Sequence, residues 1–331
     1  NPGWFQGTAD AVRQSLRHLD KMDFEYVLIL SGDQLYQMDF SKMIDAHKKS
    51  GAALTIATIP VGDREAPEFG ILKSNSEQVI TSFIEKPSKE VLPEWISDTG
   101  MAMQSQGRNY LASMGIYVFN KEILFQLLNE VHPEATDFGK EIIPDSISNY
   151  KVLSYQYDGY WTDIGNIYSF FEANLALTDE IPPFNLFDSA QTVYNRPRML
   201  PPAKISGTII NKAIIAEGSI IHAKEITQSV IGIRSRIGKD TVVKNSYIMG
   251  CDYYETIEQI NKKNASGEPI LGIGERCTIE DAIVDKNCSI GNDVHIKGGA
   301  HLEKVDHPLY TIKDNIIVIK KGAIIPNGFK I

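Results

Sequence analysis

The spacing of apolar residues changes character about halfway along the chain. Val12, Leu16 and Leu19 recur at helical spacing and predict a helix that begins near Thr8, which would serve as its N-cap. Further helices are expected around 43–47, 123–131 and 167–177. Strand candidates, rich in β-branched and aromatic residues, are 26–30, 54–59, 79–84, 114–119 and 152–157. This alternation predicts an α/β sheet with helices on both faces, and the apolar run 26–30 is typical of a strand buried in a parallel sheet.

A second period appears beyond a proline-rich stretch. Prolines interrupt residues 179–202, which predicts an extended linker. Apolar residues then recur about every six positions, at Ile209, Ile215, Ile221, Ile226, Ile231, Ile237 and Val243, and again at Ile273, Ile279, Val284, Ile290 and Ile296. Such a repeat predicts a parallel β-helix, with 250–272 as a loop between coils. The expected domains are 1–178 and 205–331, joined by a linker at 179–204.

Composition narrows the function. A chain of 331 residues allows about two domains. Its net charge of −9 argues against nucleic-acid binding, which needs a basic face. No apolar run is long enough to span a bilayer, so no membrane partner is expected. The three cysteines lack metal-ligand spacing and are too few for a disulfide framework, which favours a cytoplasmic location.

Two aspartates stand out as candidate chemistry. Asp33 follows the apolar run 26–30 and Gly32, which would allow a sharp turn into a cleft. Asp163 lies in a similar setting, beside aromatic residues and before Gly165. Two carboxylates brought together repel each other unless a cation lies between them, and Mg²⁺ uses carboxylates, water and substrate phosphates as ligands. The pair therefore suggests metal-assisted chemistry on phosphate, and the alternative is that each aspartate caps a turn or a helix.

Five short motifs carry a resemblance to a known family. They are Trp4 to Ala11 (WFQGTADA), Phe83 to Pro87 (FIEKP), Ala112 to Tyr117 (ASMGIY), Asp137 to Gly139 (DFG) and Tyr253 to Thr256 (YYET). In this order they resemble glucose-1-phosphate adenylyltransferase, and the Trp-Phe-Gln of the first motif is nearer to the plant and cyanobacterial type. The resemblance implies a Rossmann-like α/β nucleotide-diphospho-sugar transferase domain, followed by a left-handed parallel β-helix of hexapeptide repeats. The implied reaction converts ATP and glucose 1-phosphate to ADP-glucose and pyrophosphate.

The resemblance also implies roles for individual residues. Asp33 and Asp163 would hold Mg²⁺, and Lys86 would bind the phosphate of glucose 1-phosphate. The implied sugar and nucleotide contacts are Phe5, Gly70, Glu85 and Ser113 for the sugar phosphate, with Gly7 and Thr8 for the adenine. Phe5 stands where some members have tyrosine. Without the resemblance, Lys86 reads as a solvated turn lysine and Ser113 as an ordinary strand residue.

The family's glycine-rich phosphate loop would precede Asn1, so we expect a chain that lacks the first βα units and is itself inactive. Lys313 and Lys321 resemble the positions that hold a phosphorylated effector, and a homotetramer is implied. The alternatives are another sugar nucleotidyltransferase, a regulatory subunit without catalysis, and a hexapeptide acyltransferase. His222, His295 and His301 would be bases for the last, although exposed histidines on coil corners are more often solvated.

Overall fold

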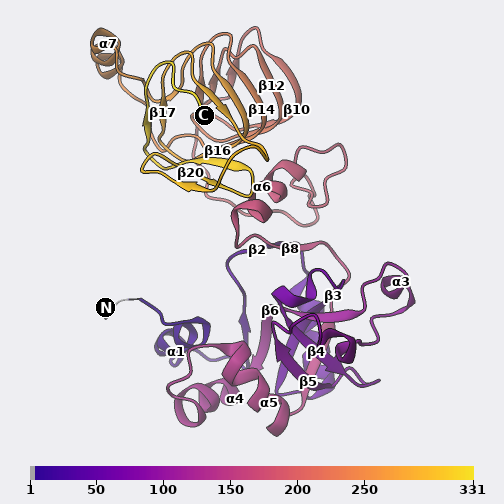
Figure 1. The fold of residues 1–331 in the computed structure, drawn as a ribbon. Helices are drawn as coiled ribbons and strands as arrows, with labels where there is room; N and C mark the ends of the chain where they lie inside the picture. The colour runs from indigo at the N-terminus through magenta and orange to yellow at the C-terminus, as the bar shows by residue number, and fades with distance from the viewer. Residues whose placement is uncertain (1–3) are drawn as a thin grey trace. The chain divides into compact units, whose positions relative to one another are not determined.

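The computed structural model describes residues 4–331, which form two compact units (Figure 1). The first unit contains the residues up to Gly32 together with 37–161, and the second contains 33–36 and 162–331. The helices of the first unit are α1 (Thr8–Leu19), α2 (Phe40–Ser50), α3 (Met101–Gln104), α4 (Lys121–Gln126) and α5 (Ile143–Asn149), with short helical segments η1 (Ala66–Glu68), η2 (Leu92–Trp95), η3 (Leu127–Val131) and η4 (Phe138–Ile142). Its strands are β1 (Tyr26–Ile29), β3 (Leu54–Val61), β4 (Gly70–Ser74), β5 (Ile80–Glu85), β6 (Tyr110–Asn120) and β7 (Val152–Gln156).

The sheet of the first unit is mixed. Its strands run in the order β5-β4-β6-β3-β7, and β1 also pairs with β6. Only β3 and β7 are parallel, whereas β1 is antiparallel to β6. The expectation of a parallel sheet around 26–30 is therefore wrong. An apolar run reports burial and not strand direction, and the side chains of β1 are in fact only partly buried.

Helices cover both faces of this sheet, as the alternation predicted. Leu54 and Ile56 of β3 belong to a core that also includes buried residues of α1, α4, η3 and α5. Thr55 points to the opposite face, because successive side chains alternate along a strand. There His47 of α2 lies 2.7 Å from the Thr55 hydroxyl. The strand β4 and the helix α5 were not expected from the sequence.

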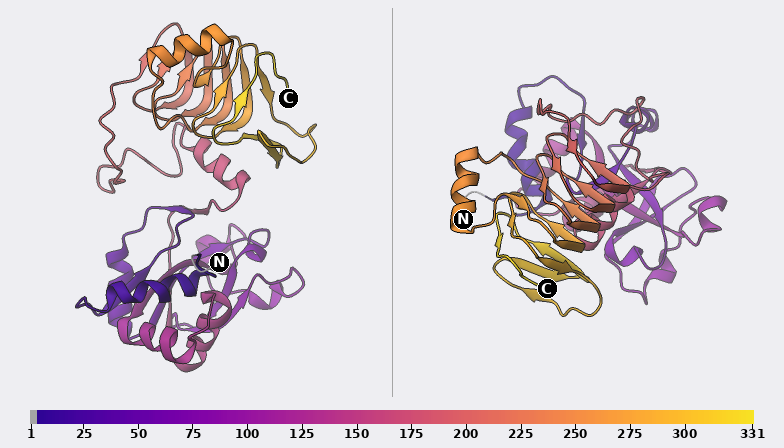
Figure 2. Two further views of the ribbon diagram at one scale, coloured as in Figure 1. Left: turned by 90° about the vertical axis from the view of Figure 1, so that its left-hand side faces the viewer. Right: turned by 90° about the horizontal axis from the view of Figure 1, so that it is seen from above.

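The second unit is built around a parallel β-helix (Figure 2). Its elements are β2 (Gln34–Tyr36), β8 (Trp161–Asp163, shared with the first unit), α6 (Ile167–Ala176), β9 (Lys204–Ile205), β10 (Ile209–Ile215), β11 (Ile220–Ile221), β12 (Glu225–Ile231), β13 (Arg236–Ile237), β14 (Val242–Ile248), α7 (Ile257–Ser266), β15 (Gly272–Ile273), β16 (Thr278–Val284), β17 (Ser289–Ile290), β18 (His295–Lys297), β19 (Val305–Asp306), β20 (Tyr310–Lys313), β21 (Ile316–Ile319) and β22 (Ile324–Ile325). Strands of successive coils pair in parallel, so that Ile226, Val243 and Ile279 stack inside. This confirms the hexapeptide interpretation. Ile209 is the exception, being 66% exposed in the first coil.

The insertion at 250–272 contains a helix and is not only a loop. Thr256 accepts a hydrogen bond from the backbone N–H of Gln259, whose side chain accepts one from the Thr256 N–H. This capping box satisfies two donors at the start of α7, and Gly267 ends the helix in the left-handed conformation. Both signals are present in the sequence, but the polar composition of the segment concealed them.

The helix α6 belongs to the second unit, whereas the sequence placed the end of the first domain at residue 178. Phe171 and Leu175 of α6 pack against Ile283 and Ile316 of the β-helix. Because α6 packs on the β-helix, it belongs to the second unit, and the first unit ends at residue 161. Residues 177–203 contain no helix or strand. Within 4–331, every helix is too short or too polar to cross a bilayer.

Candidate active site

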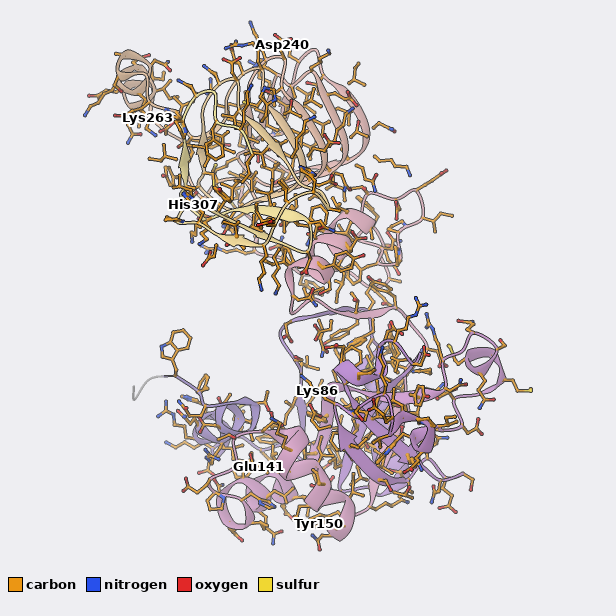
Figure 3. All side chains as sticks on the ribbon, in the orientation of Figure 1. Lys86, Glu141, Tyr150, Asp240, Lys263 and His307 are labelled. Carbon is orange, nitrogen blue, oxygen red and sulfur yellow. The ribbon has the colours of Figure 1, made fainter. Side chains whose placement is uncertain are left out.

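Lys86 is held in an uncommon backbone conformation at the end of β5 (Figure 3). Its φ angle is 48°, in the left-handed region that residues other than glycine seldom adopt. The following Pro87 is buried and disfavours helical conformations of the preceding residue. A hydrogen bond of 3.0 Å from the Lys86 N–H to the Phe69 carbonyl fixes this turn. The side chain is exposed, so the strained backbone presents an ammonium group at the surface.

Two glycines make room for the neighbouring carboxylate, Glu85. A Cβ atom at Gly70 would lie 2.5 Å from the Phe83 ring and 2.9 Å from Glu85 Oε2. A Cβ atom at Gly139 would lie 3.0 Å from the same oxygen and 3.3 Å from Asp137 Oδ1. Any side chain at either position would displace the carboxylate. Gly70 therefore leaves space for Glu85, and its contact with the sugar stays a prediction.

The Glu85 carboxylate lies near both negatively and positively charged groups. Burial raises its pKa above the ordinary value, and the charge of Asp137 raises it further. The ammonium groups of Lys86 and Lys140 act in the opposite direction. Asp137 itself is held by the backbone N–H of Lys140, which donates to its carboxylate over 3.0 Å. The four residues form a charged cluster, which we call the Glu85 cluster.

The strand β6 contains a bulge next to Ser113. The register of β3 against β6 shifts between Ile56 and Thr58, and Gly115 adopts a φ of 67° inside β6. The Ser113 hydroxyl accepts a hydrogen bond of 3.3 Å from the Gly115 N–H and also bonds the Tyr117 side chain. Burial is the main cause that raises the pKa of Tyr117 to about 12, and the charge of Glu85 contributes. Ser113 itself still pairs with Thr58 at the edge of this bulge, and its bond to Tyr117 links it to a side chain on which the charges of Glu85 and Asp137 act.

The residues expected on the nucleotide side lie at the start of α1. A Cβ atom at Gly7 would lie 2.3 Å from the Thr136 carbonyl oxygen, so only glycine fits. The prediction that Thr8 is the N-cap is wrong, because Gly7 occupies that position. The Thr8 hydroxyl instead accepts a hydrogen bond of 3.3 Å from the Phe138 N–H, which couples α1 to η4. Phe5 precedes the helix and is 58% exposed.

Asp33 and Asp163 lie close together in the second unit. The strands β2 and β8 pair, and the Ile164 N–H donates to the Asp33 carbonyl over 3.0 Å. The Gly165 N–H donates to Asp163 Oδ1 over 2.8 Å. A Cβ atom at Gly165 would lie 3.0 Å from Asp163 Oδ1 and 3.6 Å from Asp33 Oδ2, so both carboxylates face one small region. The chain bends at Gly32, as expected, but the φ angle of Gly32 is not positive, so the bend does not require glycine.

These two aspartates fit a hard divalent cation. Both offer carboxylate oxygens, the donors that Mg²⁺ prefers, and Mg²⁺ needs only one or two protein carboxylates when water and phosphates complete its shell. Among residues 4–331, no cluster of three or more metal-ligating side chains occurs. Two carboxylates suit an ion whose remaining ligands are water and substrate phosphates.

The two lysines expected at an effector site lie at the two ends of the β21 segment of one hairpin. Lys313 ends β20 beside the turn into β21, and Lys321 follows the far end of β21. The strand rise of about 3.3 Å per residue separates their backbones by roughly 10 Å or more. Between them in sequence, Lys320 is ion-paired with Asp306 at 2.6 Å. The effector role of Lys313 and Lys321 stays a prediction.

Three residues of the site were missed from the sequence. Asp137, Lys140 and Tyr117 were not assigned roles, although Asp137 and Tyr117 belong to motifs that the resemblance rests on. The only signal in the sequence was membership of these motifs, and Lys140 directly follows the Asp-Phe-Gly segment. Only the fold shows that 85, 117 and 137 meet.

Comparison with known families agrees with this geometry. Residues 2–180 match the model of the nucleotidyl transferase family, which covers more than half of the chain. The chain belongs to that family and is a nucleotidyltransferase. Residues 198–329 match a second model, the GLGC left-handed parallel β-helix domain. The fold is therefore a nucleotidyl transferase domain followed by a left-handed β-helix.

Proposed function

We propose that this chain acts in the transfer of an adenylyl group from ATP to glucose 1-phosphate, with release of pyrophosphate. The observation that carries the proposal is the Glu85 cluster: carboxylates and ammonium groups lie together at a strained strand end, within a chain of the nucleotidyl transferase family. The match of 198–329 to the GLGC β-helix domain supports glucose 1-phosphate and ATP as the substrates.

In this proposal each side chain has a task that its environment supports. Glu85 and Asp137 are carboxylate acceptors for sugar hydroxyls, which are hydrogen-bond donors. Lys86 donates to the phosphate of the sugar, and its fixed backbone limits where the ammonium group can reach. A phosphate oxygen of glucose 1-phosphate then attacks the α-phosphorus of ATP, and pyrophosphate leaves in line with it.

Nucleotidyl transferases commonly use Mg²⁺, and Asp33 and Asp163 would hold it. The ion would neutralise charge on the phosphate oxygens during transfer. The chain's own contribution is to hold two carboxylates close together beside Gly165, whose N–H donates to Asp163.

Binding to the purified chain tests the sugar side, measured by titration calorimetry with glucose 1-phosphate, mannose 1-phosphate and galactose 1-phosphate. We expect glucose 1-phosphate to bind most tightly and Glu85→Gln to weaken it. The matched control is Glu134→Gln, which removes an exposed carboxylate of the same unit. Equal binding of all three sugars, or equal effects of the two variants, would contradict the assignment. If an enzyme that contains this chain uses a nucleotide other than ATP more efficiently, the protein is a different sugar nucleotidyltransferase.

A further inference from the structure

The β-helix contains a cleft that the transfer reaction does not use. It has a volume of about 510 Å³ and lies between the end of the α7 insertion and the coil corners that follow β11, β13, β15 and β17. This volume falls within the usual range of small-molecule sites, roughly 300–1,000 Å³. The helix α7 has no buried residue and projects from the side of the β-helix (Figures 1 and 2).

The insertion at 250–272, which forms one wall of the cleft, is held at both ends by specific contacts. The Tyr254 hydroxyl donates to the Gly218 carbonyl over 2.8 Å. Glu255 accepts a hydrogen bond from the Leu271 N–H over 2.8 Å and forms an ion pair of 2.6 Å with Lys263. Because these contacts join both ends of the insertion to each other and to a coil, the cleft is preformed.

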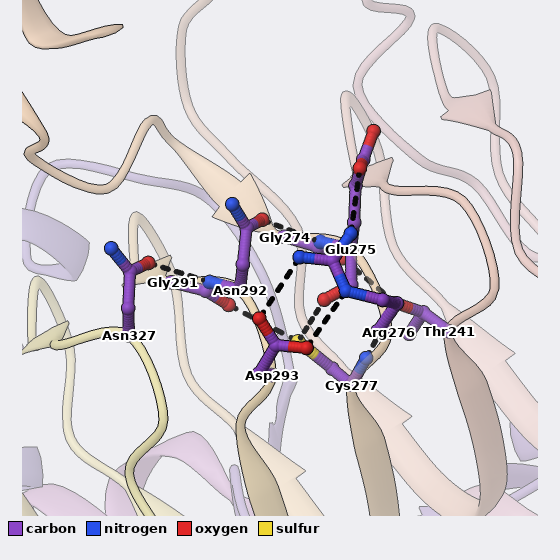
Figure 4. Close-up of polar contacts among 9 residues, drawn as sticks. All are labelled: Thr241, Gly274, Glu275, Arg276, Cys277, Gly291, Asn292, Asp293 and Asn327. Atoms are coloured by element: carbon purple, nitrogen blue, oxygen red, sulfur yellow. Dashed lines mark hydrogen bonds and ion pairs between the residues drawn. The ribbon is translucent and has the colours of Figure 1, made fainter.

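Two stacked asparagines turn amide donors toward this cleft. The backbone N–H of Glu275 donates to Asn292 Oδ1 over 2.8 Å, and the N–H of Asn292 donates to Asn327 Oδ1 over 2.8 Å (Figure 4). A backbone N–H can only donate, so each oxygen must face the backbone and each Nδ2 must face the other way. Both asparagines line the cleft, and in residues 4–331 neither Nδ2 group has a hydrogen-bond partner.

Positive side chains complete the lining. Arg236 and Lys239 are exposed, line the cleft, and have no side-chain partner within the described part of the chain. Of the two carboxylates in the lining, Glu275 is ion-paired with Arg276 at 3.1 Å, which leaves Glu268 as the only unpaired acid among the described lining residues. Unpaired donors therefore outnumber unpaired acceptors, which favours an anion.

We propose that this cleft binds a small anion that carries a phosphate group, through Arg236, Lys239 and the amides of Asn292 and Asn327. The cleft has room for more than phosphate alone, so a phosphorylated metabolite fits the volume. The proposal does not depend on the transfer reaction, because every lining residue belongs to the β-helix and its insertion.

Isoleucine methyl NMR of the 331-residue chain tests the site directly, with inorganic phosphate as the probe. Ile270, Ile273 and Ile290 line the cleft and report on it separately from any phosphate bound in the other unit. We expect shifts at these three methyl groups that saturate with phosphate and do not occur with potassium chloride at equal ionic strength. Shifts that grow without saturation, or that chloride reproduces, would refute a specific site.

Charge variants then test the named residues. The double variant Arg236→Gln, Lys239→Gln is expected to weaken phosphate binding at these methyl groups at least tenfold. The double variant Lys204→Gln, Lys212→Gln removes two exposed charges elsewhere on the β-helix and should leave binding unchanged. Asn264→Glu adds a carboxylate at a cleft-lining position of α7 and should weaken binding, whereas Asn264→Gln should not. Unaltered distant methyl signals verify folding, and equal affinity of both double variants would overturn the proposal.

Discussion

Replacing Glu85 by Gln should change substrate affinity and stability in opposite directions. The carboxylate is the proposed acceptor for sugar hydroxyls, and a hydrogen bond to a charged group contributes about 1.5–3 kcal/mol, or roughly 10–150-fold in binding. Glutamine keeps the shape and one acceptor oxygen, so we expect the lower end, a loss of about tenfold in affinity for glucose 1-phosphate. Titration calorimetry of the purified chain measures it.

The stability effect follows from the raised pKa of Glu85, whose causes are burial first and the charge of Asp137 second. The native chain therefore keeps Glu85 protonated at pH values where the unfolded chain, near the ordinary pKa of 4.5, has already ionised. Stability from this group is present below pH 4.5 and is lost as the pH rises through the folded pKa. Glutamine cannot ionise, so the melting temperature of Glu85→Gln should exceed that of the wild type by more at pH 7 than at pH 4.

Thermal unfolding at a series of pH values checks this sign, with Glu134→Gln as the control. If Glu85→Gln lowers the melting temperature at pH 7, the carboxylate stabilises the fold and is not a strained binding group. If affinity for glucose 1-phosphate is unchanged, Glu85 does not contact the sugar. Either result would refute the reasoning.

Three other predictions concern an enzyme that contains this chain and carries out the proposed transfer. Asp33→Asn should reduce turnover by at least on the order of 10²-fold with little effect on folding, since the side chain is exposed; near wild-type synthesis of ADP-glucose would remove Asp33 from the metal site. Lys86→Ala should raise KM for glucose 1-phosphate by about 10–150-fold and change KM for ATP less, and equal losses would indicate a general defect. Lys313→Ala and Lys321→Ala should each raise the concentration of a phosphorylated effector needed for half-activation; unchanged activation would place the effector site elsewhere.

The hexapeptide repeat made most of the second unit predictable from the sequence. Each coil buries one aliphatic residue on the next, so Ile226, Val243 and Ile279 reveal the period directly. The direction of the strands in the first unit was not predictable in the same way. The strand β1 is as apolar as a parallel strand, yet it pairs with β6 in the antiparallel sense, because pairing depends on residues almost 100 positions away.

Site residues could be predicted from the sequence only where charged residues lie within a recognisable motif. Lys86 and Glu85 are adjacent in sequence, so a motif found both. Asp137 and Glu85 both lie beside Gly139 and their charges interact, and local patterns contain no information on that proximity. The backbone features are equally hidden: nothing in the local pattern indicates that Lys86 is left-handed, or that Gly115 forms a bulge.

The backbone of Lys86 supplies a last test, which separates strain from charge. A residue other than glycine in the left-handed region costs roughly 1–2 kcal/mol, because its Cβ approaches the following carbonyl oxygen. Lys86→Ala and Lys86→Gly both remove the ammonium group, but only glycine removes this strain. Glycine also gains entropy when unfolded, which offsets part of the difference, so we expect Lys86→Gly to be more stable than Lys86→Ala by up to about 1 kcal/mol, or about 2–4 °C in Tm. Both should lose affinity for glucose 1-phosphate equally. If alanine proves the more stable variant, the turn at Lys86 stores no strain, and the orientation of its ammonium group needs another explanation.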